Sequence, residues 1–158
     1  MLETDLESKL AALATEAKEL RESVVEPKQT DSVSTMHASL LAARRALDRL
    51  EAIVADVGRL RARARARVAE AKDEFDEATI QAMQKSKIGE YSSAEERRMT
   101  YKAASFDQFR ALRQAEKQEA LISEVYDYCY MRYRGLDGAR KDLDTRIRLI
   151  TLQTSLES

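Results

Sequence analysis

The chain has 158 residues, of which 35% are charged and only 6% aromatic, and it contains four glycines, one proline and no tryptophan. So few aromatic side chains argue against a large globular core, and so little glycine and proline argues against a sheet with many turns. The net charge of −1 is less basic than that of a typical nucleic-acid-binding domain, and no run of apolar residues is long enough to span a membrane.

The first expected element is a helix over residues 2–24. Its apolar residues recur at spacings of three and four, which places them on one stripe of a helix. The opening segment MLETDLESKL is acidic rather than basic and then apolar, so we expect no secretory signal and a cytoplasmic protein. Pro27 disfavours helix at the residue before it, and residues 25–34 therefore form an expected linker.

A second, much longer helix is expected over residues 35–86. Its apolar stripe alternates steps of four and three for six heptads, interrupted at Arg61. Such a strict seven-residue repeat predicts a supercoiled helix that requires a partner along its whole length. The stripe consists of Met36, Leu40, Ala43, Leu47, Leu50, Val54, Val57, Ala64, Val68, Ala71, Phe75, Ala78 and Ala82.

Residues 87–93 predict a hairpin loop, because Gly89 breaks the stripe and Ser93 with Glu96 has the form of a capping box. A third helix is expected over 94–156, with a bend or break near Gly135 and Gly138. The short connection between two long stripes predicts an antiparallel helical hairpin. The expected fold is therefore all-α: a long antiparallel coiled-coil hairpin with an additional N-terminal helix, in one elongated domain over 1–158.

Five arginines at alternate positions form the most unusual local feature, which we name the basic collar: Arg59, Arg61, Arg63, Arg65 and Arg67. Guanidinium groups spaced by alanines can follow a phosphate backbone and bind its oxygens in pairs. The alternative is a solvated helix face whose arginines pair with Asp56, Glu70 and acids of a facing helix. The sequence leaves both interpretations open.

A second basic group surrounds the expected hairpin loop. Bases next to aromatic rings can hold a nucleic-acid backbone while the rings stack on its bases, although a polar loop with packed tyrosines would look the same. The candidate nucleic-acid-binding residues of this group are Lys85, Lys87, Tyr91, Arg97, Arg98, Tyr101 and Lys102.

Four of the six tyrosines fall within residues 126–133, and their rings cannot all face one seam of a helix. Aromatic-rich and Met-rich helix surfaces are typical of subunit interfaces, so we predict a homo-oligomer. Packing inside the chain is the alternative for Tyr126, Cys129 and Tyr133. The candidate interface residues in this segment are Tyr126, Tyr128, Cys129, Tyr130 and Tyr133.

No pattern indicates an enzyme, a metal or a cofactor. His37 is the only histidine and has no second metal ligand nearby, and Cys129 lies among apolar residues without a histidine within reach in the sequence. The acidic run at 73, 74, 76 and 77 lacks the glycine and loop character of a calcium site, and a solvated face explains it better. We therefore expect a protein without catalysis, metal or cofactor.

From about residue 60 to residue 152 the chain resembles the phage recombination mediator family of the UvsY type. The resemblance rests on RLRARARARVAEA, on KIGEYSSAEERRMTYK and on LISEVYDYCYMRYRGLDGARKDLDTRIRLITL. It implies a small helical protein that binds single-stranded DNA through its basic helix and assists a RecA-like recombinase. It also implies oligomerisation through the C-terminal helix over 126–150, which adds four candidate interface residues: Leu136, Leu143, Ile147 and Ile150. The acidic helix expected over 2–24 has no counterpart in that pattern.

The expected function is therefore that of a non-catalytic, oligomeric accessory protein that binds single-stranded DNA or RNA, with a RecA-like recombinase or a helicase as partner, in the host cytoplasm if a phage encodes it. The alternative is a coiled-coil scaffolding or inhibitor protein that binds no nucleic acid. A peripheral membrane protein fits less well, because the arginines alternate with alanine and lack a large apolar insertion face.

Overall fold

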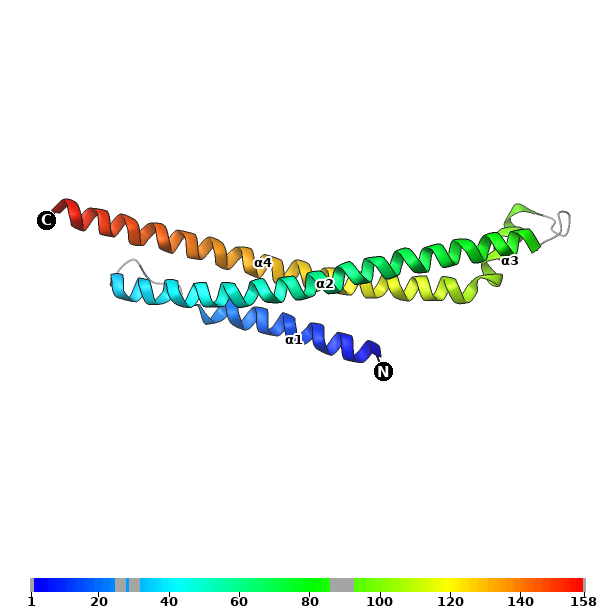
Figure 1. The fold of residues 1–158 in the computed structure, drawn as a ribbon, viewed down its shortest axis with the longest axis horizontal. Coiled ribbons are helices and arrows are strands. Elements are labelled where there is room, and N and C mark those ends of the chain that lie inside the picture. Colours follow the sequence, from blue (N-terminus) through cyan, green and yellow to red (C-terminus); the bar gives the residue numbers. More distant parts are fainter. Residues whose placement is uncertain (1, 25–27, 29–31, 86–92, 158) are drawn as a thin grey trace. The chain divides into compact units, whose positions relative to one another are not determined.

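The computed structural model describes residues 2–24, 28, 32–85 and 93–157. Within these ranges the chain forms four helices and no strand: α1 (Leu2–Ser23), α2 (Val33–Lys85), α3 (Ala94–Ala104) and α4 (Phe106–Glu157) (Figure 1). The all-α class is confirmed. So is the long hairpin, because α2 and α4 pack against each other in antiparallel directions, with α1 as the additional N-terminal helix.

Serine side chains cap the first turns of α2 and α3. The Ser32 hydroxyl accepts a hydrogen bond from the Thr35 amide (3.2 Å), so α2 begins at Val33, two residues before the predicted start. The Ser93 hydroxyl likewise accepts from the Glu96 amide (3.1 Å) and caps α3, as the capping box predicts. The predicted loop over 87–93 lies outside the described residues except for Ser93.

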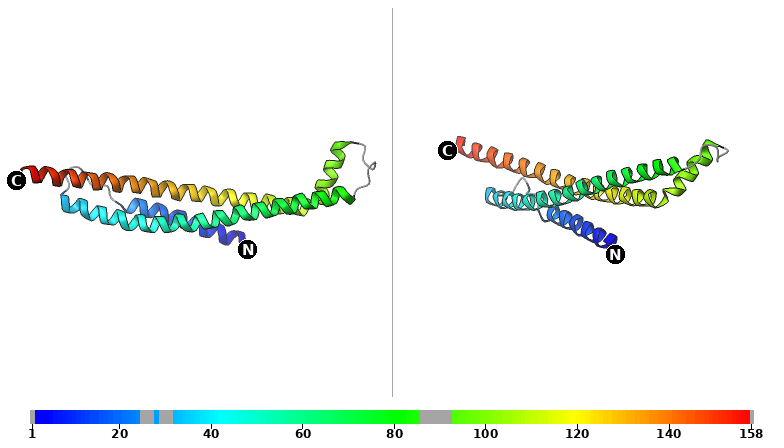
Figure 2. Two further views of the ribbon diagram at one scale, coloured as in Figure 1. Left: turned by 45° about the horizontal axis from the view of Figure 1, so that its top comes forward. Right: turned by 45° about the vertical axis from the view of Figure 1, so that its right-hand side comes forward.

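The prediction of one helix over 94–156 is wrong at Ser105, which separates α3 from α4. Ser105 is fully buried and non-helical (φ −110°, ψ 26°), and both its amide and its hydroxyl donate to the Tyr101 carbonyl oxygen. Figure 2 shows α3 turned away from the line of α4 at this point. By contrast, α4 is continuous through Gly135 and Gly138, where the sequence predicted a bend or break.

The chain was expected to form a single domain, but its contacts divide it into two compact units. The three-helix unit comprises Met1–Gly58 and Glu124–Ser158, and the collar unit comprises Arg59–Ser123. In the three-helix unit, α1 and the C-terminal part of α4 lie against the first half of α2 (Figure 1). Met36 and Leu40 of α2 pack there against Leu143 and Ile147 of α4.

In the collar unit, the second half of α2 runs antiparallel to the start of α4. Going from Arg61 to Arg65 along α2 corresponds to going back from Ser123 to Glu119 along α4. At the other end of the unit, the rings of Phe75 and Phe109 are 5.7 Å apart between centroids. This constant register is what two matched heptad stripes predict, and it places the basic collar beside the segment of α4 that contains Glu119 and Ser123.

Candidate nucleic-acid interface

The basic collar lies on α2 in the collar unit, and its arginines fall on two flanks of the helix. At about 100° per residue, Arg61 and Arg65 share one flank, while Arg63 and Arg67 share the opposite one. Both flanks adjoin the buried stripe that contains Ala64. The environments of the two flanks differ.

The first flank is occupied by α4. The Arg61 Nε donates to the Ser123 hydroxyl (2.9 Å), and the Arg65 Nε donates to Glu119 Oε1 (3.3 Å). Ser123 in turn donates to the same Glu119 oxygen (2.7 Å). These bonds stabilise the ionised carboxylate, so Ser123 first and Arg65 second lower the pKa of Glu119 below its ordinary value.

The second flank faces solvent. Arg63 and Arg67 are exposed, and among the residues that the structure describes neither has an ion pair or a hydrogen bond through its side chain. Arg59 is also exposed, but Arg59 and Arg61 both take part in further interactions in the chain. Of the five predicted collar residues, Arg63 and Arg67 are therefore the ones most available to an external anion.

The second predicted basic group lies largely on α3, which has no buried residue. Lys85, Arg97, Arg98 and Lys102 are exposed, and Tyr101 is half-buried. A shallow hollow on α3 is lined by Glu95, Arg98, Met99 and Lys102, and Met99 is 68% exposed. The predicted residues Lys87 and Tyr91 lie outside the described residues.

Acidic residues follow the collar directly along α2. Glu70, Asp73, Glu74, Asp76 and Glu77 are all exposed, which agrees with the interpretation of this run as a solvated face. In the described ranges no group of three or more histidine, cysteine or acidic side chains could hold a metal ion. The helix thus presents a basic segment and then an acidic one within a few turns.

The structure places much of the predicted oligomer interface inside the chain. Cys129, Leu136, Leu143 and Ile147 are buried in the core of the three-helix unit, so their side chains are not available to another subunit, and for these four the prediction is corrected. Their spacing of seven, seven and four along α4 places these residues on one stripe of the helix, and this stripe packs within the chain. Ile150 is half-buried against the same core.

The tyrosines occupy intermediate positions. Tyr126 packs close to Gly58, and the rings of Tyr126 and Tyr130 stack with centroids 6.0 Å apart. Tyr130 also stacks on Tyr133 at 6.5 Å, and Arg132 lies over the ring of Tyr128 at 5.0 Å. Tyr130 remains 40% exposed, and Met131 beside it is 74% exposed. Together with the exposed Asp127, these two residues form the surface part of the tyrosine segment.

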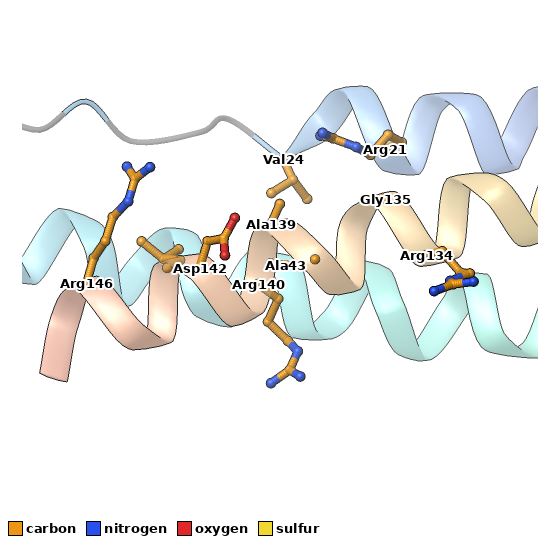
Figure 3. Close-up of a pocket in the computed structure, with 11 residues that line it drawn as sticks. Arg21, Val24, Ala43, Arg134, Gly135, Ala139, Arg140, Asp142 and Arg146 are labelled. Carbon is orange, nitrogen blue, oxygen red and sulfur yellow. The ribbon is translucent and has the colours of Figure 1, made fainter.

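A hollow of about 360 Å³ lies in the three-helix unit between the end of α1, α2 and α4. Gly135 and Gly138 are among the residues that line it, and a Cβ added to either would meet nothing within 4 Å. Figure 3 shows that its arginines point apart rather than toward one centre, Arg140 and Arg146 to opposite sides of α4. The hollow therefore lacks the converging polar groups of a ligand site.

Glu119 and Ser123, the partners on α4 of the flank formed by Arg61 and Arg65, were not identified from the sequence. The signal that could have found them is their spacing of four on α4, which matches the spacing of Arg61 and Arg65 on α2 in an antiparallel register. No helix in the described part of the chain is long and apolar enough to cross a membrane. No family model, no curated protein and no solved structure matches the chain.

Proposed function

We propose that this protein is a non-catalytic, oligomeric accessory protein that binds single-stranded nucleic acid through its collar unit. The observation that carries the proposal is the exposed flank of α2, where Arg63 and Arg67 stand one helical turn apart without an ion pair in the described residues. Arginines in this position can bind successive phosphates at little desolvation cost.

Further cations in the same unit support an extended contact. Arg97, Arg98 and Lys102 are exposed on α3, and Met99 beside them offers an apolar surface on which a base could lie. Contacts of this kind are individually weak, and several subunits that bind one strand would add their contributions. The wider role, as a mediator that assists a RecA-like recombinase in the cytoplasm of a phage host, is what the resemblance described above implies.

The test is a fluorescence anisotropy titration of the full chain with a labelled oligothymidylate at several salt concentrations. The variant Arg63→Gln/Arg67→Gln removes the exposed flank, and we expect weaker binding and a salt dependence whose slope falls by about 1.4, or about 0.7 for each lost phosphate contact. The matched control is Arg61→Gln/Arg65→Gln, which removes the same charge from the flank that α4 already occupies. It should change binding much less.

The proposal is lost if the wild-type chain does not bind the oligonucleotide at moderate salt. It is also lost if the two double variants weaken binding equally, because a general effect of net charge would then explain the result. Helix content measured by circular dichroism should be the same in all three chains, since these arginines are not buried in the core.

A specific observation favours a second candidate, a coiled-coil interaction protein without nucleic-acid binding. Part of the collar is satisfied inside the chain, by Glu119 and Ser123, and exposed acids follow it on the same helix. Charge segments of this kind also specify protein partners. A pure interaction protein would show no binding that grows with oligonucleotide length, so the same titration separates the two candidates.

A further inference from the structure

The exposed flank of α2 carries acids as well as arginines, and the two kinds of charge are separated along the helix. Arg63, Arg67, Glu70 and Glu74 all lie within a sector of about 60° on the helix. All four are exposed, and none has a side-chain ion pair or hydrogen bond among the described residues. The flank thus consists of two cations followed by two anions.

On the isolated helix this order gives two repulsive pairs and one attractive pair, Arg67 with Glu70 at a spacing of three. Arg63 and Arg67 are four residues apart, as are Glu70 and Glu74, and like charges at this spacing repel each other on a helix surface. A solvated face gains more from opposite charges at that spacing. The segregated arrangement therefore leaves repulsion that an external partner of matching pattern would relieve on both halves at once.

A second copy of the same flank has the matching pattern. If two α2 helices meet in antiparallel directions about a two-fold axis between residues 68 and 69, Arg63 of each copy faces Glu74 of the other, and Arg67 faces Glu70. The two outer residues are about 16 Å apart along the helix at 1.5 Å per residue, so all four pairs form along one continuous contact. Such a contact is isologous, because both copies contribute the same surface.

We infer that the flank of α2 formed by Arg63, Arg67, Glu70 and Glu74 is a self-association surface, on which a second copy of this chain docks in antiparallel register. This inference does not rest on the proposed function, because the contact forms without nucleic acid. It does affect that function: docking covers Arg63 and Arg67, so a nucleic-acid strand and the second copy compete for the same two arginines.

Because the four pairs are solvent-exposed, the association is weak and depends on salt. The wild-type chain at high protein concentration should sediment as a dimer or larger assembly at low salt. It should lose this contact at about 0.5 M salt, where the screening length falls to about 4 Å. Sedimentation velocity of the full chain, with no nucleic acid present, measures this directly.

Charge reversal gives the decisive experiment. The variant Arg63→Glu/Arg67→Glu has four acids on the flank, and Glu70→Arg/Glu74→Arg has four bases, so neither should associate with itself through this surface. An equimolar mixture of the two should associate, since every pair across the contact is then opposite in charge. The quadruple variant that combines all four changes restores the pattern in reverse order and should associate like the wild type.

Circular dichroism of each double variant, with the helix content of the wild type as the reference, shows whether both are folded. The inference is overturned if the wild type shows no salt-dependent association, if either double variant associates as the wild type does, or if mixing them restores nothing. Its failure is distinguishable from failure of the proposed function. Glu70→Arg/Glu74→Arg keeps both arginines, so it should still bind the oligonucleotide, and more tightly than the wild type, whether or not the chain self-associates.

Discussion

The two units of the molecule have the same hairpin but very different cores. Among the residues that the structure describes, all but two of the buried apolar side chains belong to the three-helix unit, and the exceptions in the collar unit are Ala64 and Ile122. The difference follows from the number of helices. A pair of helices covers one stripe of each, whereas a third helix covers a second face, as α1 does for α2 where it contributes buried Leu10 and Ala17.

The comparison shows that the heptad stripe alone does not determine how much stability a segment contributes. The stripe continues through both units, yet in the collar unit its members are mostly half-buried, and Ile80 and Met83 next to it are about half exposed (53% and 48%). The three-helix unit therefore carries most of the hydrophobic stabilisation. The collar unit keeps its charged and apolar surfaces accessible, which suits a region that binds a partner.

The largest expected effect is the loss of stability when a core side chain is truncated, and we compare one truncation in each unit. Leu50→Ala removes a fully buried side chain of the three-helix unit and should lower the free energy of unfolding by about 2–5 kcal/mol. Leu112→Ala removes a half-buried side chain of the collar unit and should cost about 1–2 kcal/mol. Urea unfolding followed by circular dichroism measures both, and equal losses would contradict the comparison.

A second, smaller difference is expected between the reactivity of the native thiol, which lies in the three-helix unit, and that of a thiol introduced into the collar unit. Cys129 is fully buried, and burial raises the pKa of its thiol above the ordinary value of 9.0. In the folded chain it should react with a thiol reagent at least about 100-fold more slowly than in the unfolded chain, because reaction requires opening of the core. A cysteine placed by Leu112→Cys in a Cys129→Ala background should react much faster.

The same pKa shift determines whether the free energy of unfolding rises or falls with pH on the alkaline side. The folded chain holds the Cys129 proton to higher pH than the unfolded chain does, so this thiol lowers stability as the pH rises above 9.0. Cys129→Ala should therefore lose less stability than the wild type on the alkaline side. An identical alkaline decline in both chains would show that the thiol is not protected in the folded state.

Much of the fold was predictable because it depends on local patterns. The stripe residues Leu50 and Leu136 are fully buried as expected, and the Ser93 cap begins α3 at the predicted residue. The break at Ser105 was not predictable, because it depends on hydrogen bonds to Tyr101 and on contact with Thr79 of α2 (3.3 Å between hydroxyl oxygens). A serine in a helical pattern gives no sign of such a tertiary contact.

The candidate site was predictable in composition but not in environment. The sequence identifies the arginines of the collar, and helical geometry separates them into two flanks. Which flank lies beside α4 depends on the register of the hairpin, and only that register brings Glu119 to Arg65 and Ser123 to Arg61. The interface prediction came from the tyrosine-rich composition of residues 126–133 and from the family resemblance, and neither distinguishes packing within a chain from packing between chains.

A fourth prediction concerns unused space in the better-packed unit. Gly135 and Gly138 are exposed within α4, and a Cβ at either position meets no atom within 4 Å. Gly135→Ala and Gly138→Ala should each raise the free energy of unfolding by about 0.5–1 kcal/mol, because alanine favours the helix. Gly58→Ala is the matched control, since its Cβ would lie 3.4 Å from the Tyr126 ring and part of the gain would be lost. Equal gains at all three sites would contradict this account.

The smallest expected effect on stability, and the most informative for the collar, comes from Glu119→Gln. The amide keeps an acceptor for Ser123 but removes the charge that holds Arg65, so helix content should not change. In the wild type the pKa of Glu119 is lowered, so its contribution to stability is present above the ordinary value of 4.5 and is lost as the pH falls through the folded value. The two chains should therefore converge in stability in acid.

At neutral pH the same variant removes the ion pair of Arg65, which is already exposed, and gives the collar unit a third arginine without a carboxylate partner on α4. If the proposed function is correct, oligonucleotide binding should tighten and the slope of its salt dependence should steepen by up to about 0.7. This result would show that Arg65 can bind a phosphate and that its ion pair with Glu119 prevents this in the wild type. Unchanged affinity and slope would mean that a strand reaches only the flank of Arg63 and Arg67, so that the pairing on α4 serves the hairpin alone.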